Sequence, residues 1–254
     1  MKWQLTASAV LLSAMILVYA FWSADPRAEY FGGAVQMLML GYSAISLTRT
    51  SVANPSASRK PWTRLAIGAW IWVLAQIMEV CEIALGQPAY GTLADGFWIF
   101  GYFPLLGGLH EFTRNFQTIQ LPKSTAVVSG SACAALFCCL FYFLILPQLL
   151  DIERNIFSKL LDLAYPVFDF LLLAAAIVML LKSKVSNAPL LRSFRFMSVG
   201  FLLLLIADIG LSLTSTEDSL LYLILDVPYF GSYCMLALAA KTIPSGGWAS
   251  LPAN

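Results

Sequence analysis

The chain contains, at residues 193–214, the stretch SFRFMSVGFLLLLIADIGLSLT, in which Arg195 and Asp208 are the only charged residues. A helix of this length would extend about 33 Å at about 1.5 Å per residue. The hydrocarbon core of a bilayer is roughly 30 Å thick. The stretch therefore predicts a helix that spans a membrane.

Seven further apolar stretches have the length expected of spanning helices. They lie at residues 5–23, 30–48, 63–85, 93–113, 125–147, 157–181 and 219–240. The connections between them are short and contain Pro, Gly, Asn or Ser, which are typical of turns. The sequence predicts an all-α, polytopic membrane protein with eight transmembrane helices, forming a single membrane domain over residues 1–254.

The composition excludes several classes of protein. The 254 residues are 59% hydrophobic and 11% charged, whereas soluble domains are roughly 25% charged. The net charge of +1 provides no basic field for nucleic acid, so no such partner is expected. The five cysteines lie in apolar runs without C-x-x-C spacing, and one histidine cannot supply bis-histidine haem ligation. We expect no metal and no cofactor.

Lysine and arginine gather in alternate connections between the predicted helices. The residues concerned are Arg49, Arg59, Lys60, Arg64, Arg114, Lys123, Lys182, Lys184, Arg192 and Arg195. Because basic residues in short loops remain cytoplasmic, these three connections are expected inside and the other, more acidic ones outside. Lys2 and Lys241 then place both termini in the cytoplasm, and the expected location is the inner (plasma) membrane.

The third and fourth stretches share a pattern with the last two. Gly68 precedes Asp95 by 27 residues, and Gly200 precedes Asp226 by 26. Aromatic residues three and seven positions after each Asp are Trp98, Tyr102, Tyr229 and Tyr233. The pattern predicts two parallel four-helix repeats, residues 1–120 and 121–254. Each repeat opens with an uncharged helix, which we expect at the lipid-facing periphery.

Acidic residues occur inside several of the predicted helices, where an ionised carboxylate is costly and usually marks function. They are Glu79, Glu82, Asp95, Asp162, Asp169, Asp208 and Asp226. Glu79 lies 15 residues from Arg64, Asp169 lies 13 from Lys182, and Asp208 lies 13 from Arg195. These separations place the three acids roughly 20 Å into the membrane, near its midplane.

No Lys or Arg is expected at that depth. The acids must then be protonated, solvated in a cavity, paired with a bound cation or ligand, or hydrogen-bonded to other side chains. Candidate partners are Tyr42, Tyr165, Trp72 and Gln76. The expected ligand-binding residues are Glu79, Glu82, Asp95, Tyr102, Tyr165, Asp169, Asp208 and Asp226. The alternative is that neutral carboxyls only join helices through hydrogen bonds.

Three short motifs resemble the multi-helix membrane sensor regions that precede diguanylate cyclase or histidine kinase domains in bacteria. They are DGFWIFGYFP at residues 95–104, AYPVFD at 164–169, and Ala207-Asp208 before an outer connection. The resemblance implies a sensory function. It also implies either a stand-alone sensor that relies on a partner or the membrane region of a longer protein.

A second resemblance is to the eight-helix lysoplasmalogenase family. That family has an acid in helix 3, a histidine late in helix 4 and an aspartate in helix 7. The corresponding residues here are Glu79, His110 and Asp208, which the resemblance implies as catalytic. Asp169 and Asp208 on neighbouring helices also suggest an aspartyl intramembrane protease as a further alternative.

The main functional hypothesis is a membrane-embedded sensory or ligand-binding module without turnover. It would take an apolar or amphiphilic small molecule near the mid-membrane carboxylates and act on a cytoplasmic signalling partner or a second copy of the chain. A lysoplasmalogenase-like lipid hydrolase is the first alternative. A proton- or cation-coupled transporter is the second, since acids without basic partners suit ion coupling.

Overall fold

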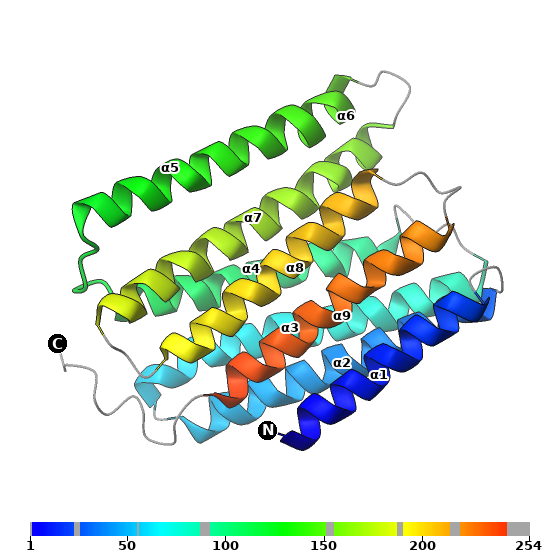
Figure 1. The fold of residues 1–254 in the computed structure, drawn as a ribbon, viewed down its shortest axis with the longest axis horizontal. Helices are drawn as coiled ribbons and strands as arrows, with labels where there is room; N and C mark the ends of the chain where they lie inside the picture. Colours follow the sequence, from blue (N-terminus) through cyan, green and yellow to red (C-terminus); the bar gives the residue numbers. More distant parts are fainter. Residues whose placement is uncertain are drawn as a thin grey trace.

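The computed structural model describes residues 2–22, 26–54, 56–86, 92–150, 155–186, 190–213 and 219–242. Every regular element in these residues is a helix (Figure 1). The helices are α1 (Lys2–Trp22), α2 (Pro26–Ala53), α3 (Ser56–Ala84), α4 (Leu93–Asn115), α5 (Lys123–Leu140), α6 (Leu146–Leu150), α7 (Ile156–Val185), α8 (Leu191–Leu213) and α9 (Ser219–Lys241). The all-α prediction is confirmed for the described residues.

A π-helical turn, η1 (Phe141–Ile145), joins α5 to α6, so residues 123–150 form one continuous run. Pro147 follows this turn. In a regular α-helix its ring would meet the carbonyl of Phe143, four residues earlier. A π turn relieves such crowding because it shifts the hydrogen bonds by one residue.

Five helices in the described part of the chain are long and apolar enough to cross a membrane. They are Tyr30–Ala53, Arg59–Ala84, Lys123–Ile145, Ile156–Val185 and Leu191–Leu213. The chain therefore has the character of a multi-pass membrane protein. The other three predicted spans are helical as α1, α4 and α9, and the count of eight membrane crossings stays a prediction.

Six helices form a closed ring in which each packs against the next: α2, α3, α4, α7, α8, α9 and back to α2. Helix α1 packs outside this ring on α2 and α9, and α5 packs outside it on α7. In Figure 1 these two helices lie along opposite edges of the bundle. Their peripheral position agrees with the expectation for the uncharged stretches 5–23 and 125–147. Large side chains such as Val127 and Phe143 on the run from α5 to α6 are exposed.

Two close helix contacts hold the sequence-related pairs together. A Cβ on Gly68 of α3 would lie 2.9 Å from the Gly101 carbonyl oxygen of α4, and one on Gly200 of α8 would lie 3.2 Å from the Ser232 carbonyl oxygen of α9. A larger residue at Gly68 would also meet Leu105 at 2.5 Å. Glycine is thus required at Gly68 because the backbones approach too closely for a side chain.

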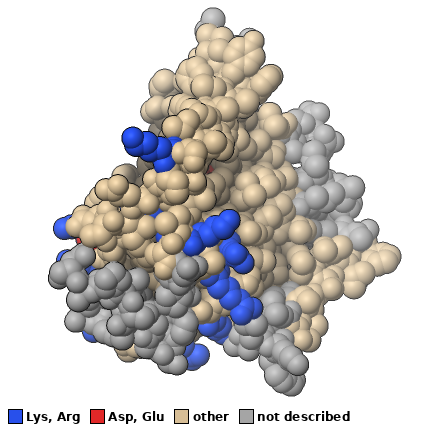
Figure 2. Space-filling view, turned by 60° about the vertical axis from the view of Figure 1, so that its left-hand side comes forward, with Lys and Arg blue, Asp and Glu red and all other residues tan. Residues whose placement is uncertain are grey.

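Most of the described basic residues gather at one end of the bundle, and Lys159 near the start of α7 is an exception. Arg64 on α3 pairs with Glu111 on α4 at 3.1 Å, and Lys182 on α7 donates to the Phe116 carbonyl after α4 at 3.1 Å. Figure 2 turns this end forward and shows the Lys and Arg side chains on it. The connections predicted to be cytoplasmic lie at this end. Lys2 was also predicted there, but its side chain lies outside the described residues. The orientation itself stays a prediction.

Candidate functional site

Two of the predicted midplane acids meet at the hydroxyl of Tyr102. This hydroxyl donates a hydrogen bond to Oδ1 of Asp169 at 2.6 Å and lies 3.5 Å from Oδ2 of Asp208. Tyr229 donates a second hydrogen bond to Oδ1 of Asp208. The four side chains come from α4, α7, α8 and α9, and we call them the carboxyl–tyrosine network. Of its members, Asp169 is fully buried and Asp208 and Tyr102 are nearly so.

Aromatic packing fixes the direction of the Tyr102 hydroxyl. The Tyr102 ring stacks on Phe168 with centroids 5.2 Å apart and meets Trp72 edge-on at 5.1 Å. The Trp72 indole donates to the Trp98 carbonyl at 2.9 Å, which holds that ring in turn. Since Phe168 precedes Asp169 in the chain, one turn of α7 supplies both the surface against which the ring packs and the hydrogen-bond acceptor.

The second oxygen of Asp169 is the unusual feature of the network. Oδ2 receives no hydrogen bond from an N–H or O–H donor among the described residues. The carboxyl groups of Asp169 and Asp208 lie beside the same Tyr102 hydroxyl, at 2.6 and 3.5 Å, and the two groups interact with each other. Two adjacent carboxylates cannot both stay ionised in a buried site. A proton shared by the pair would remove one of the two charges.

Glu79 belongs to a neighbouring group one helical turn away. The Trp98 indole donates to Glu79 Oε2 at 3.2 Å, and the Gln76 amide donates to the same oxygen at 3.4 Å. Trp98 precedes Tyr102 by one turn of α4, so Glu79 lies about 6 Å nearer the α4 N-terminus than the network does. Gln76 is therefore confirmed as a partner of a predicted acid.

Trp98 and Tyr229 have the same role in the two sequence-related helix pairs. Each stands three residues after an Asp, Asp95 or Asp226. Trp98 on α4 donates to an acid of α3, and Tyr229 on α9 donates to an acid of α8. The predicted site omitted both residues. The repeated aromatic position was the sequence signal that could have identified them.

Asp95 caps the N-terminus of α4. One of its carboxyl oxygens accepts the Thr92 backbone N–H at 3.0 Å, the arrangement that caps helix N-termini. The other accepts the Tyr165 hydroxyl at 2.6 Å. Asp95 and Tyr165 therefore connect the beginning of α4 to α7, beside the carboxyl–tyrosine network.

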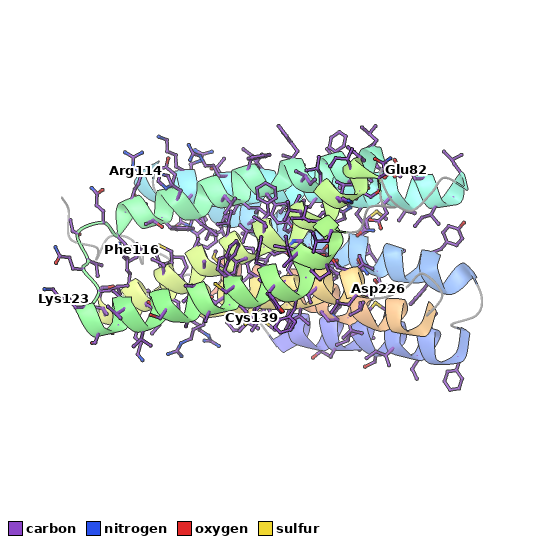
Figure 3. The ribbon with its side chains drawn as sticks, turned by 90° about the horizontal axis from the view of Figure 1, so that it is seen from above. Glu82, Arg114, Phe116, Lys123, Cys139 and Asp226 are labelled. Carbon is purple, nitrogen blue, oxygen red and sulfur yellow. The ribbon has the colours of Figure 1, made fainter. Side chains whose placement is uncertain are left out.

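Glu82 and Asp226 are half-buried and lie toward the end of the bundle away from Arg114 and Lys123 (Figure 3). Both interact electrostatically with Glu79. The described salt bridges lie at the basic end, on Glu111. In the described part of the chain none reaches Glu79, Asp169 or Asp208. The side chain of Asp162, also expected inside a helix, lies outside the described residues.

The three residues implied by the lysoplasmalogenase resemblance do not come together. His110 is exposed near the basic end of α4. At the neighbouring Gly108, a Cβ would lie 2.9 Å from the Pro61 carbonyl oxygen on α3. Glu79 stands 18 residues beyond Pro61 on that same helix, about 27 Å away at about 1.5 Å per residue. Asp208 instead contacts Tyr102 and Tyr229.

Comparison of the chain with protein-family models, curated proteins and solved structures found no match in any of the three.

Proposed function

We propose that this chain is a membrane-embedded sensory module that binds an apolar or amphiphilic ligand without turnover. Its switching element is the carboxyl–tyrosine network. The observation that supports this proposal best is the position of the Tyr102 hydroxyl between Asp169 at 2.6 Å and Asp208 at 3.5 Å. A phenolic hydroxyl has one proton to donate, so it can donate fully to one acid at a time.

This geometry offers two discrete arrangements. Tyr102 donates either to Asp169 on α7 or to Asp208 on α8, and a proton shared by the acids compensates the one that loses its donor. A ligand that contacts the helices differently in the two arrangements would shift their populations. Helices α4 and α7 both continue to the basic end, where Lys182 contacts the Phe116 carbonyl. A displacement of α4 against α7 would therefore reach the surface proposed for a cytoplasmic partner.

The sequence motifs favour the same interpretation. The three motifs that resemble bacterial sensor regions contain Tyr102, Asp169 and Asp208, which are three of the four network members. The duplicated pattern is supported by the ring order, since α4 packs on α7 just as α9 packs on α2. Two parallel four-helix repeats with both termini inside are part of this proposal.

The test is to measure which amphiphiles the protein retains. Wild type, Tyr102→Phe and Asp208→Asn would be purified in mild detergent and compared by native mass spectrometry. Tyr142→Phe is the matched control because Tyr142 is 64% exposed on the peripheral run. We expect a stoichiometric amphiphile in wild type and control, and at least a tenfold lower occupancy in the network variants. Equal retention in all four proteins would refute the proposed site.

Proton- or cation-coupled transport is the second candidate. It is favoured by one observation: Glu79, Asp169 and Asp208 form no described salt bridge, so protons or cations must balance their charge. Transport predicts a pH change inside sealed proteoliposomes under an imposed ion gradient, abolished by Asp169→Asn. A flat trace in wild type would exclude transport of the ion tested.

A further inference from the structure

A cavity of about 220 Å³ lies between α1, α2 and α9, outside the carboxyl–tyrosine network. Its walls are apolar except for two groups, the hydroxyl of Tyr42 and the ammonium of Lys241. The apolar part includes Leu12, Met39, Phe230, Cys234 and Leu238. An apolar cavity with one cation and one hydroxyl in its wall suits a molecule of the same character, an acyl chain with a charged head.

The direction of the Lys241 side chain is the informative feature. Near a membrane surface, lysine normally extends its charged end toward water. Lys241 is the last residue of α9, and the neighbouring Ala240 carbonyl accepts the Thr50 hydroxyl of α2 at 2.9 Å. Tyr42 precedes Thr50 by eight residues, about 12 Å farther into the bundle. Because Lys241 Nζ donates to the Tyr42 hydroxyl, its charge points into the bundle.

That charge has no described counter-ion. The Lys241 ammonium lies 4.3 Å from the centroid of the Tyr42 ring and donates to its hydroxyl, and no described carboxylate forms a salt bridge with it. An ammonium has three donors, so two remain for a ligand. The Tyr42 oxygen accepts from lysine, which leaves its own proton for donation to an anion. An unneutralised cation beside an apolar cavity is unfavourable until an anion joins it.

We propose that this cavity binds a single-chain fatty-acid carboxylate, whose head group is held by Lys241 and Tyr42. One cation matches one carboxylate. The volume lies below the roughly 300 to 1,000 Å³ of sites for drug-sized ligands, which favours one acyl chain over a bulkier amphiphile. The site is distinct from the carboxyl–tyrosine network, and the inference does not depend on the network's role.

The experiment uses a photoreactive fatty acid, palmitate with a diazirine in its chain, and the full-length protein in phosphatidylcholine nanodiscs. Cross-linked peptides are identified by mass spectrometry. We expect saturable labelling of α1 and α9 peptides, competed by excess palmitate and not by hexadecanol, which lacks the charge. We expect at least tenfold weaker labelling for Lys241→Gln, weaker labelling for Tyr42→Phe, and near wild-type labelling for Lys241→Arg.

Two control variants separate this cavity from the basic end and from the carboxyl–tyrosine network. Lys123→Gln removes a lysine from the basic end outside the cavity, and Asp208→Asn alters the network, so both should label like wild type. Unchanged labelling of Lys241→Gln, or equal competition by hexadecanol, would overturn the proposal. Complete competition by phosphatidylglycerol at the same concentration as palmitate would also overturn it, because the occupant would then be a phospholipid. Loss of labelling in Asp208→Asn alone would also overturn the proposal, because the fatty acid would then bind at the carboxyl–tyrosine network.

Discussion

The hydroxyl of Tyr102 on α4 donates a 2.6 Å hydrogen bond to Asp169 on α7, which is 67 residues away in the chain. Both side chains are almost completely excluded from the surface. Helices α4 and α7 belong to different halves of the chain. This buried contact is therefore one of those that join the two predicted repeats.

Removing this donor should destabilise the bundle. In Tyr102→Phe the ring still packs on Phe168 and Trp72, but Asp169 loses its only described hydroxyl donor. A buried acceptor left unsatisfied costs about 1–3 kcal/mol. We expect a lower Tm in a thermal-shift assay in detergent. The exposed-site control Tyr142→Phe should stay within about 0.5 kcal/mol of wild type, and a Tyr102→Phe protein as stable as this control would contradict the assignment.

A proton shared between Asp169 and Asp208 would give a spectroscopic signal. One protonated carboxyl should give a carbonyl stretching band in the infrared spectrum of the protein at neutral pH, with a shift on exchange into D₂O. We expect Asp169→Asn or Asp208→Asn to remove or displace that band. Glu111→Gln should leave it unchanged, because Glu111 pairs with Arg64 at 3.1 Å. The absence of any such band in wild type would mean that both acids are ionised.

The contact between α3 and α4 predicts a strong difference between two glycines. A Cβ on Gly101 would lie 2.4 Å from Trp72 Cδ1, whereas a Cβ on Gly41 meets nothing within 4 Å. Overpacking typically costs about 1–3 kcal/mol, so Gly101→Ala should lower the Tm. It should also disturb Trp72, whose ring lies against Tyr102. Gly41→Ala should be neutral or slightly stabilising, and similar melting of the two variants would contradict this contact.

Hydropathy was sufficient to locate the helices, because an apolar stretch is recognised from its own residues, whether it is buried in lipid or against other helices. It was less able to place their ends. Helix α2 continues to Ala53, beyond the predicted limit at residue 48, since a helix can extend past the apolar segment into polar surroundings. Helix α3 likewise begins at Ser56, before the predicted residue 63.

The sequence predicted the candidate site mainly as a set of acidic residues. In the structure, the grouping of these acids depends on the side chains that donate hydrogen bonds to them. Counting from basic residues put Asp169 and Asp208 at similar depth, and these two do meet through Tyr102. Glu79 was assigned the same depth but contacts Trp98, one turn away. Counting residues therefore missed the depth of Glu79 by about one turn. It also does not show the face on which a side chain lies. Which acids share a partner therefore depends on helix packing, as does the pairing of Tyr42 with Lys241.

The basic end of the bundle is expected on the cytoplasmic side of the membrane. In a variant whose five native cysteines are replaced by Ala or Ser, Leu85→Cys and Gln117→Cys would place single thiols at opposite ends of the α3–α4 pair. Leu85 is 76% exposed, and Gln117 is also exposed. Because the basic connections should stay cytoplasmic, a membrane-impermeant maleimide should label the Leu85→Cys variant in intact cells. It should label the Gln117→Cys variant only after permeabilisation, and the reverse pattern would place the basic end outside.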